Sequence, residues 1–241
     1  MLIRLENPAL LSKAIDVISE LVTEVRIKLN EFGLSIVALD PANVAMVGFK
    51  IPRSAFSQFE AGNETIGVSL DSLKHILKRC STKSSLILEQ KENVLNIRIE
   101  DRIKRNFSIG LIEIESEEKE IPDLEYSAMI ELNPNDFIAS VEDCLIVADA
   151  CSFIVKEKKF LIEAKGINSA RSEFSEDEAK IQAEDCKSRY SLEYLQKFMK
   201  GAKLCDKIKL RFASDHPLRV DLRGEHLELI FILAPRVETE D

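Results

Sequence analysis

The sequence is poor in the residues from which disulfides and metal sites are built. It has five cysteines, an odd number, widely spaced and without a Cys-x-x-Cys pair. They are Cys80, Cys144, Cys151, Cys186 and Cys205. The three histidines, His75, His216 and His226, have no Cys or His partner at metal-ligand spacing. These absences argue against a disulfide framework and a zinc site and favour a reducing compartment. We expect no metal and no cofactor.

Glycine-rich loops and long apolar runs are also missing. The eight glycines form neither Gly-x-Gly-x-x-Gly nor Gly-x-x-x-x-Gly-Lys-Ser/Thr, so the known backbone cradles for nucleotide phosphates are not expected. Apolar runs such as 229–234 are far too short to cross a bilayer, and no basic segment followed by an apolar one opens the chain. The sequence therefore predicts neither a membrane span nor an export signal.

Basic residues are outnumbered, with 33 Lys and Arg against 42 Asp and Glu and a net charge of -9. Such a chain is not expected to bind nucleic acid over its whole surface, so any contact with DNA must be local. Hydrophobic residues at 45% and charged residues at 31% indicate a folded globular protein.

The most informative feature is an internal repeat. With Pro8 placed over Pro134, residues 5–38 align with residues 131–164 without a gap, and the apolar positions coincide. After a small deletion, residues 69–78 align with 191–200 and residues 84–90 with 206–212. The same order of helix, strands, helix and strands occurs twice, which predicts two similar α+β domains in tandem.

Each copy is expected to begin with a helix capped by Asn-Pro, at Asn7-Pro8 and Asn133-Pro134. The first helix places its apolar residues on one arc and Asp16 and Lys13 on the other. Alternating segments at 25–29, 33–39 and 45–51 predict half-buried antiparallel strands. We expect each copy to form a sheet with two helices on one face.

An acidic run separates the copies. Between residues 113 and 126, Glu115, Glu117, Glu118 and Glu120 surround Lys119 before Ile121-Pro122, which indicates an extended, solvated connector. The predicted division is residues 1–112, connector 113–128 and residues 129–241.

Positive charge gathers on the second helix of each copy. In the first copy these residues are Lys74, His75, Lys78, Arg79 and Lys83, and in the second copy Lys197, Lys200 and Lys203. A solvated helix face explains each group alone, but repetition at matched positions favours a surface that contacts phosphates. No groove-entering motif is visible, so the contact should be independent of base sequence.

Enzymatic chemistry has little support. Asp40 and Asp215 could belong to a metal-dependent carboxylate nuclease, the unlikeliest alternative, but both occupy turn contexts before or near proline and lack a convergent third ligand. We expect a binding platform, not an enzyme.

Several local motifs resemble the DNA sliding clamps of the proliferating cell nuclear antigen family. They are LDPANVAMV at 39–47, SLDSLKHILKR at 69–79, Ile121-Pro122 with Tyr126, the Ser-Asp-x-Pro-Leu turn at 214–218, and LAPRV at 233–237. The Leu-Asp-Pro and Leu-Ala-Pro-Arg-Val sequences look closer to archaeal members than to eukaryotic ones. The resemblance implies a DNA-clamp fold whose subunits close into a pseudo-sixfold ring, with Lys13 joining the basic residues above around duplex DNA. It also implies a cytoplasmic, nucleoid-associated protein if the source is archaeal, and a nuclear one if it is eukaryotic.

The resemblance further implies that DNA polymerase, clamp loader, flap endonuclease and DNA ligase dock short peptides into an apolar pocket. Carried over residue by residue, that pocket uses Leu39, Asn43, Val44, Met46, Ile121, Pro122, Tyr126, His216, Pro217, Ile232, Leu233, Ala234 and Pro235. The alternative is that Val44, Met46 and Ile232 are ordinary core residues.

Subunits in this family pair a strand of the first domain, here 104–111, with one of the second, here 168–175. The implied interface residues are Arg79, Arg105, Phe107, Ile109, Ile138, Asp143, Ile146, Ala170 and Phe174. The first helix of the second copy departs from the pattern, because it has no Lys or Arg and places Ile138, Leu145 and Ile146 on its outward arc. We expect these exposed apolar residues to be covered by a neighbouring subunit. A homotrimer is the first expectation, and a subunit of a heteromeric ring is the alternative.

Overall fold

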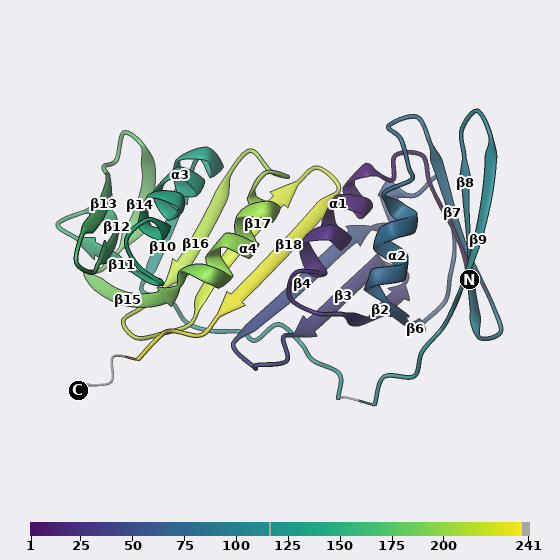
Figure 1. The fold of residues 1–241 in the computed structure, drawn as a ribbon, viewed down its shortest axis with the longest axis horizontal. Coiled ribbons are helices and arrows are strands. Elements are labelled where there is room, and N and C mark those ends of the chain that lie inside the picture. The colour runs from purple at the N-terminus through teal and green to yellow at the C-terminus, as the bar shows by residue number, and fades with distance from the viewer. Residues whose placement is uncertain (116, 238–241) are drawn as a thin grey trace. The chain divides into compact units, whose positions relative to one another are not determined.

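The computed structural model describes residues 1–115 and 117–237, so residue 116 of the expected connector and residues 238–241 of the expected second domain lie outside the described residues. The chain divides into two compact units (Figure 1). The first holds Met1–Pro41, Val47–Ile121 and Glu225–Leu229, and the second holds Ala42–Met46, Pro122–Gly224 and the residues from Ile230 onward. The division at 112 and 128 stays a prediction, because two short segments group with the opposite unit.

The first half of the chain contains two α-helices and a short 3-10 helix among its strands. In order these are β1 (Leu2–Leu5), α1 (Ala9–Ile18), β2 (Glu24–Asn30), β3 (Gly33–Leu39), β4 (Ala45–Pro52), η1 (Arg53–Ala55), β5 (Gln58–Glu60), β6 (Glu64–Ser69), α2 (Leu70–Leu77), β7 (Ser85–Lys91), β8 (Val94–Glu100) and β9 (Lys104–Gly110).

The second half repeats this order without the 3-10 helix. Its elements are β10 (Ala128–Leu132), α3 (Pro134–Leu145), β11 (Ala150–Lys156), β12 (Lys159–Lys165), β13 (Ser169–Phe174), β14 (Ala179–Ala183), β15 (Cys186–Ser191), α4 (Leu192–Ala202), β16 (Ile208–Phe212), β17 (Leu218–Gly224) and β18 (Leu227–Leu233). The predicted tandem repeat is confirmed.

Strand pairing repeats as well. β1 pairs antiparallel with β5 and β7, as β10 does with β14 and β16, and β2 pairs with β3 and β6, as β11 does with β12 and β15. Each half therefore contributes two strand groups. In the first half their orders are β5-β1-β7-β8-β9 and β4-β3-β2-β6, and in the second half they are β14-β10-β16-β17-β18 and β13-β12-β11-β15. The expectation of one sheet per half, opened by a helix, was wrong. Alternation identifies strands but not their partners, and the short β1 and β10 precede the helices.

The first helices start differently in the two halves. The Asn133 side chain accepts a hydrogen bond of 2.8 Å from the Asn135 backbone N–H, with Pro134 in the first turn, as predicted. In the first half Pro8 itself occupies the cap position, and Asn7 accepts a longer 3.2 Å bond from the Ala9 N–H. The described helices include none that is long and apolar enough to cross a membrane.

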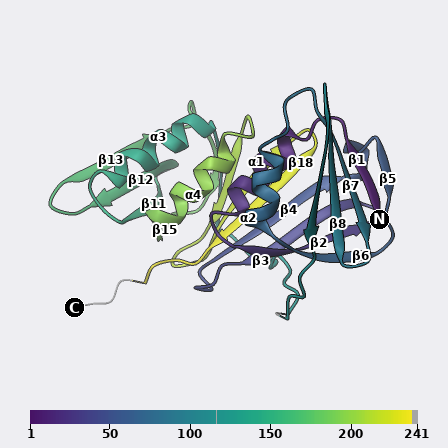
Figure 2. The same ribbon diagram turned by 45° about the vertical axis from the view of Figure 1, so that its right-hand side comes forward.

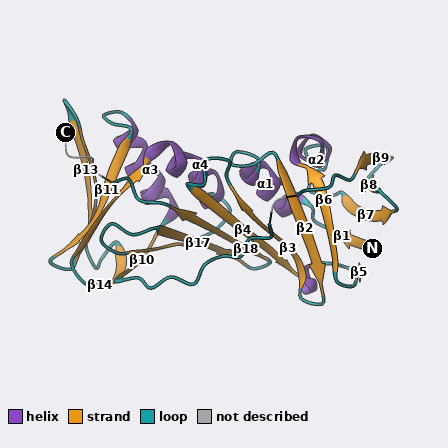
Figure 3. Ribbon diagram, turned by 90° about the horizontal axis from the view of Figure 1, so that it is seen from below, coloured by secondary structure: helices purple, strands orange, loops and turns teal. Residues whose placement is uncertain are grey.

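Apolar side chains of helices and strands form the core of each unit. In the first, Leu11 of α1 and Leu73 of α2 meet Ile27, Leu88 and Leu95 around one small cavity, and α1 lies on one side of β2–β4 in Figure 3. In Figures 1 and 2, α1 and α2 lie side by side, as do α3 and α4.

An aromatic cluster fills the core of the second unit. The ring of Phe153 contacts those of Phe137, Phe160, Tyr190 and Phe212 at centroid distances of 5.2 to 6.2 Å. All five side chains are fully buried. Edge-to-face packing of this kind stabilises a core beyond the area that it buries.

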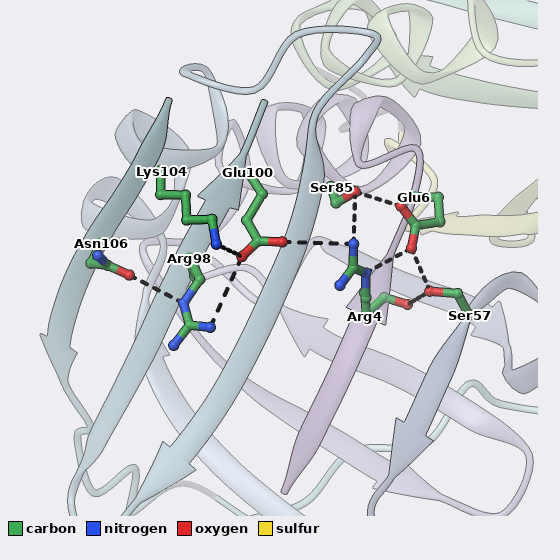
Figure 4. Close-up of polar contacts among 8 residues, drawn as sticks. All are labelled: Arg4, Glu6, Ser57, Ser85, Arg98, Glu100, Lys104 and Asn106. Atoms are coloured by element: carbon green, nitrogen blue, oxygen red, sulfur yellow. Dashed lines mark hydrogen bonds and ion pairs between the residues drawn. The ribbon is translucent and has the colours of Figure 1, made fainter. Parts of the chain in front are cut away.

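The face of β1, β7, β8 and β9 that points away from the core carries cross-strand polar contacts (Figure 4). Glu100 lies within 3.7 to 4.0 Å of Arg4, Arg98 and Lys104, and Arg98 donates to Asn106 at 3.2 Å. This polar face keeps one side of the sheet solvated, as is common for antiparallel sheets.

Candidate functional site

Basic side chains occupy corresponding places at the ends of α2 and α4. Lys74 and His75 lie in the last turn of α2 and Lys200 in the last turn of α4, while Lys78 and Lys203 follow these helices directly. Cations at a helix C-terminus are favoured by the helix dipole. Among the other candidates, Lys197 lies on α4, exposed Lys13 on α1, and exposed Arg79 and Lys83 follow α2.

A carboxylate that the sequence pattern did not single out sits among the lysines of the first unit. Asp16 of α1 lies 3.1 Å from Nζ of Lys74 and 3.0 Å from Nζ of Lys78, and Lys74 also donates to the Ser19 hydroxyl at 2.8 Å. Burial raises the pKa of Asp16, but hydrogen bonds from Lys78 and Lys74 outweigh it, so the pKa is lowered. Its place on the polar arc of the helix was the available signal.

The basic side chains at the corresponding surface of the second unit have different partners. Lys197 pairs with Glu193 one turn earlier on α4 at 3.0 Å, and its Nζ lies 4.8 Å from the centroid of the Tyr194 ring. No carboxylate of α3 pairs with it in the ion pairs found among the described residues. Lys197 is thus paired within its own helix, whereas Lys74 and Lys78 at the end of α2 pair with Asp16 of α1.

The Ser214–Leu218 turn is built by contacts to β15. The His216 carbonyl accepts hydrogen bonds from the Tyr190 hydroxyl at 2.7 Å and the Ser188 hydroxyl at 3.3 Å. The His216 ring packs edge-on against Tyr126, with centroids 5.5 Å apart. Pro217 is half-buried beside it, so the structure brings together three of the predicted pocket residues: Tyr126, His216 and Pro217.

A second group of predicted pocket residues follows β18. The Ala234 N–H donates to the Val44 carbonyl at 2.9 Å, which joins this segment to Ala42–Met46. Asn43 is exposed with a φ of 57°, and Met46, Pro122 and Pro235 are half-buried. Arg236 extends the contact through a 2.7 Å ion pair with Asp149. Leu39 and Ile121 are half-buried in the first unit.

One predicted pocket residue is placed in the core instead. Leu233 is fully buried and shares a face of β18 with Phe231, which stacks on Phe198 of α4 at 4.3 Å. Ile232 points to the opposite face and is 8% exposed. Strand alternation is the reason, because neighbouring residues of one strand face opposite sides. Leu233 therefore contributes packing, not pocket surface.

A buried charged cluster next to Tyr126 was missed from the sequence. Arg219 donates to Asp221 at 2.9 Å, and Nε of Arg211 lies 3.4 Å from the other Asp221 oxygen. The Asp221 side chain is 2% exposed. Desolvation raises the pKa of Tyr126, whose buried hydroxyl has no hydrogen-bond partner among the described residues. The i, i+2 spacing of Arg219 and Asp221 on one strand face was the only signal.

The two strands expected at the subunit joint are edge strands, as predicted: β9 ends one strand order and β13 another. Phe107 and Ile109 of β9 and Ala170 of β13 are half-buried, whereas Phe174 is buried and stacks on Phe160 at 5.7 Å. Edges of this kind carry unpaired backbone groups that can add a further strand.

Two charged candidates of this joint are already in contact within the first unit. Arg105 forms an ion pair with Asp101 and donates to the Arg79 carbonyl at 3.0 Å, while its Nε is buried without a partner among the described residues. Arg79 and Asp143 are exposed. The two arginines belong to the first unit and Asp143 to the second.

The outward arc of α3 was predicted only in part. Ile146 is 81% exposed and Leu145 is half-buried, as expected. Ile138 is only 8% exposed, so the prediction that it needs a neighbouring subunit for burial was wrong. The reason is tertiary: α3 packs against β13 of its own unit.

The two aspartates of the nuclease alternative lie in different units. Asp40 is 5% exposed in the first unit, and Asp215, in the second, has a left-handed φ of 49° in an exposed turn. Asp is among the residues that tolerate this conformation. In the part of the chain that the structure describes, no three His, Cys, Asp or Glu side chains gather as metal ligands would.

Comparison with family models covers residues 1–237. Residues 1–120 match the model of the proliferating cell nuclear antigen N-terminal domain, and residues 120–237 match that of the C-terminal domain. The chain is 36% identical over 242 residues to the DNA polymerase sliding clamp of Pyrococcus horikoshii, covering 94% of both chains. It is 38% identical over 229 residues to DNA polymerase sliding clamp 1 of Thermococcus kodakarensis, covering 91% of this chain and 92% of the relative.

Solved structures show the same fold. The proliferating cellular nuclear antigen of Entamoeba histolytica superposes with a TM-score of 0.91 at 24% identity, covering 98% of each chain. The PCNA2-PCNA3 complex of Sulfolobus tokodaii gives a TM-score of 0.89 at 23% identity, covering 99% of this chain and 100% of the other. The fold is the two-domain DNA clamp, and the chain belongs to the proliferating cell nuclear antigen family.

Proposed function

We propose that this protein is a sliding clamp that encircles duplex DNA and tethers replication and repair proteins to it, without catalysing a reaction itself. The observation that carries the proposal is the match of both tandem units, end to end, to the two domains of this family. The second helices support it, since α2 and α4 carry cations at corresponding places in an acidic protein.

The basic residues at α2 and α4, together with Lys13, would meet DNA phosphates. Long lysine side chains that contact phosphates directly or through water hold a duplex without fixing its register. Sequence-independent sliding follows from this chemistry. The protein would act wherever chromosomal DNA is held: in the cytoplasm, at the nucleoid, if its source is archaeal like its relatives.

Docking peptides of DNA polymerase, clamp loader, flap endonuclease and DNA ligase would bind beside the Tyr126–His216 contact. Half-buried apolar side chains, among them Met46, Pro122 and Pro217, suit such a surface, and Met adapts to different partners. Leu233 would support this surface from the core beneath it.

The subunit would assemble by pairing the free edges β9 and β13, with Ile146, which follows α3 directly, covered in the joint. Strand addition removes two exposed edges at once. Three chains of two units each would give the pseudo-sixfold ring that the family resemblance implies, so a homotrimer is the first candidate. Exposed Ile146, directly after a helix without Lys or Arg, also fits a subunit with non-equivalent joints, which keeps a heteromeric ring as the second candidate.

A primer-extension assay on circular single-stranded DNA tests the function. We expect the protein, with a clamp loader and polymerase of an archaeal relative, to lengthen the products made per binding event. Linear templates with free ends should show a smaller gain, because a ring slides off them. A protein that stimulates the polymerase only after a second clamp subunit is added would support the heteromeric alternative. No stimulation under either condition would contradict the proposal.

Fluorescence anisotropy with a labelled docking peptide tests the pocket separately. Ile121→Ala and Met46→Ala should each weaken binding, whereas Lys91→Ala on the β7–β8 hairpin should not. Equal affinity in all three variants would place the peptide elsewhere.

A further inference from the structure

The first part of the connector does not run free through solvent. After β9, the Leu111 N–H donates to the Asn93 carbonyl at 2.8 Å, and the Ile112 N–H donates to the Gly67 carbonyl of β6 at 3.0 Å. β6 ends its strand order, so its outer edge is available for such bonds. The chain thus leaves the first sheet group and is hydrogen-bonded to the edge of the second.

Gly67 permits this approach because it has no side chain. A Cβ at this position would lie 2.1 Å from the Ile112 carbonyl oxygen and 3.3 Å from the Ile114 side chain. The nearest obstacle is backbone, which cannot rotate away as a side chain could. Any other residue at position 67 would push the connector off β6.

Two cations of β2 hold the connector further along. Arg26, which pairs with Gly67 across the β2–β6 ladder, donates to the Ile114 carbonyl. Lys28, two residues on and therefore on the same face of β2, pairs with Glu118 at 2.7 Å. The hydrogen bond and charge of Lys28 lower the pKa of the Glu118 carboxyl. Glycine and two cations thus meet successive parts of one segment.

We propose that Gly67, Arg26 and Lys28 form a connector clamp, which positions Ile112, Ile114 and Glu118 and thereby sets how well Ile121 and the segment after it receive docking peptides. The inference rests on the proposed function, since it gives these three residues a positioning role in peptide docking. Between Glu118 and Ile121 only Lys119 and Glu120 remain, so fixing Glu118 leaves a short span of free chain.

Preorganisation is the physical reason for an effect on affinity. A segment that is already held in place loses less conformational freedom when a peptide binds. Releasing the clamp should therefore weaken peptide binding without altering any residue of the pocket. The Lys28–Glu118 pair is exposed, so its share should fall as salt is raised.

Two variants test the clamp, each with a matched control. Lys28→Glu should repel Glu118, and the double variant Lys28→Glu with Glu118→Lys should restore the pair. Gly67→Ala should displace Ile112, whereas Gly62→Ala, whose Cβ would meet nothing within 4 Å, should not. Lys91→Glu, which makes the same charge change on the β7–β8 hairpin, is the control for Lys28→Glu.

Two readouts separate this inference from the proposed function. Hydrogen exchange of the free protein should show faster exchange at Ile112 in Gly67→Ala and at residues 117–120 in Lys28→Glu, and normal exchange in the controls. Docking-peptide affinity should fall by about three- to tenfold in these two variants and recover in the charge-swapped double variant.

The outcomes can be told apart. If the peptide binds the unchanged protein, but Lys28→Glu and Gly67→Ala bind it equally well or more tightly, the connector clamp has no positioning role and the inference is overturned. If the peptide does not bind the unchanged protein, while hydrogen exchange still shows the clamp, the proposed docking function fails instead. Since Lys28→Glu alters only a surface side chain, the test does not depend on how well Gly67→Ala folds.

Discussion

At the scale of single residues, Asp221 of the second unit forms a buried ion-pair cluster with two arginines. The Asp221 carboxylate is buried, and its negative charge is stabilised by Arg219 and Arg211. A buried ion pair contributes little net stability while it is intact, because desolvation offsets the attraction. Removing one partner lowers the free energy of unfolding, however, because the remaining charges stay desolvated without an opposite charge beside them.

Asp221→Ala should therefore lower the free energy of unfolding by about 2 to 3 kcal/mol, since it leaves two largely buried guanidinium groups without their carboxylate. Urea denaturation followed by circular dichroism would measure the change. Asp206→Ala, at an exposed position between α4 and β16, is the matched control and should have little effect. A loss below about 0.5 kcal/mol in Asp221→Ala would show that the cluster is solvated.

At the scale of elements, Asp16 couples α1 to α2. Its side chain is partly exposed and paired with Lys74 and Lys78, so the contribution of each pair to stability is small. Its folded pKa is lowered, so its contribution to stability is complete above the pKa of the unfolded chain, about 3.9, and is lost as the pH falls through the folded value.

Asp16→Asn should accordingly be less stable than the unchanged protein at neutral pH, by under about 1 kcal/mol. The difference should close in acid, below the folded pKa, where the native carboxyl is protonated too. Urea midpoints compared at pH 7 and at successively lower pH would show it. A difference that stays constant with pH would mean that the amide disturbs the helix contact for another reason.

The same substitution should strengthen contact with DNA, because it removes the negative charge beside two phosphate-facing lysines. In NMR titrations with a short duplex, the plot of log affinity against log salt should steepen, by up to about one unit of slope. Lys78→Ala should change the slope in the opposite direction. Unchanged slopes in both variants would show that this end of α2 does not contact DNA.

At the scale of the whole molecule, the features expected at the subunit joint are uncovered in the single chain. β9 and β13 end their strand orders, and Ile146 is 81% exposed. Assembly through these features would satisfy backbone groups and bury apolar area together, whereas charge pairs such as Arg105 with Asp143 would add little.

Ile146→Glu should therefore weaken or abolish self-assembly, because it places a charge in an apolar joint. Light scattering at several concentrations would give the mass, with three chains expected for the unchanged protein. Phe32→Glu is the control, since Phe32 is also exposed, at 76%, but lies in the β2–β3 turn. A monomer before substitution would favour the heteromeric ring, and a trimer that persists in Ile146→Glu would remove Ile146 from the joint.

Sequence periodicity predicted the repeated order of elements and the faces of individual helices. The arc of α1 with Leu11, Ile15 and Ile18 is buried as expected, because local geometry alone decides which side chains share a face. The basic ends of α2 and α4 are equally local features. The family motifs added the expectation of a clamp, which the comparisons confirmed.

What covers each face was decided only by the tertiary structure. Ile138 and Leu233 are both buried in the single chain, although both were expected to be available to partners. Asp16 meets lysines of another helix, and Gly67 meets the connector 45 residues later in the chain. Periodicity reports the face of one element, whereas these contacts depend on residues distant in sequence. The sequence by itself determined two basic-ended clamp units, and the tertiary structure decided how the connector between them is held.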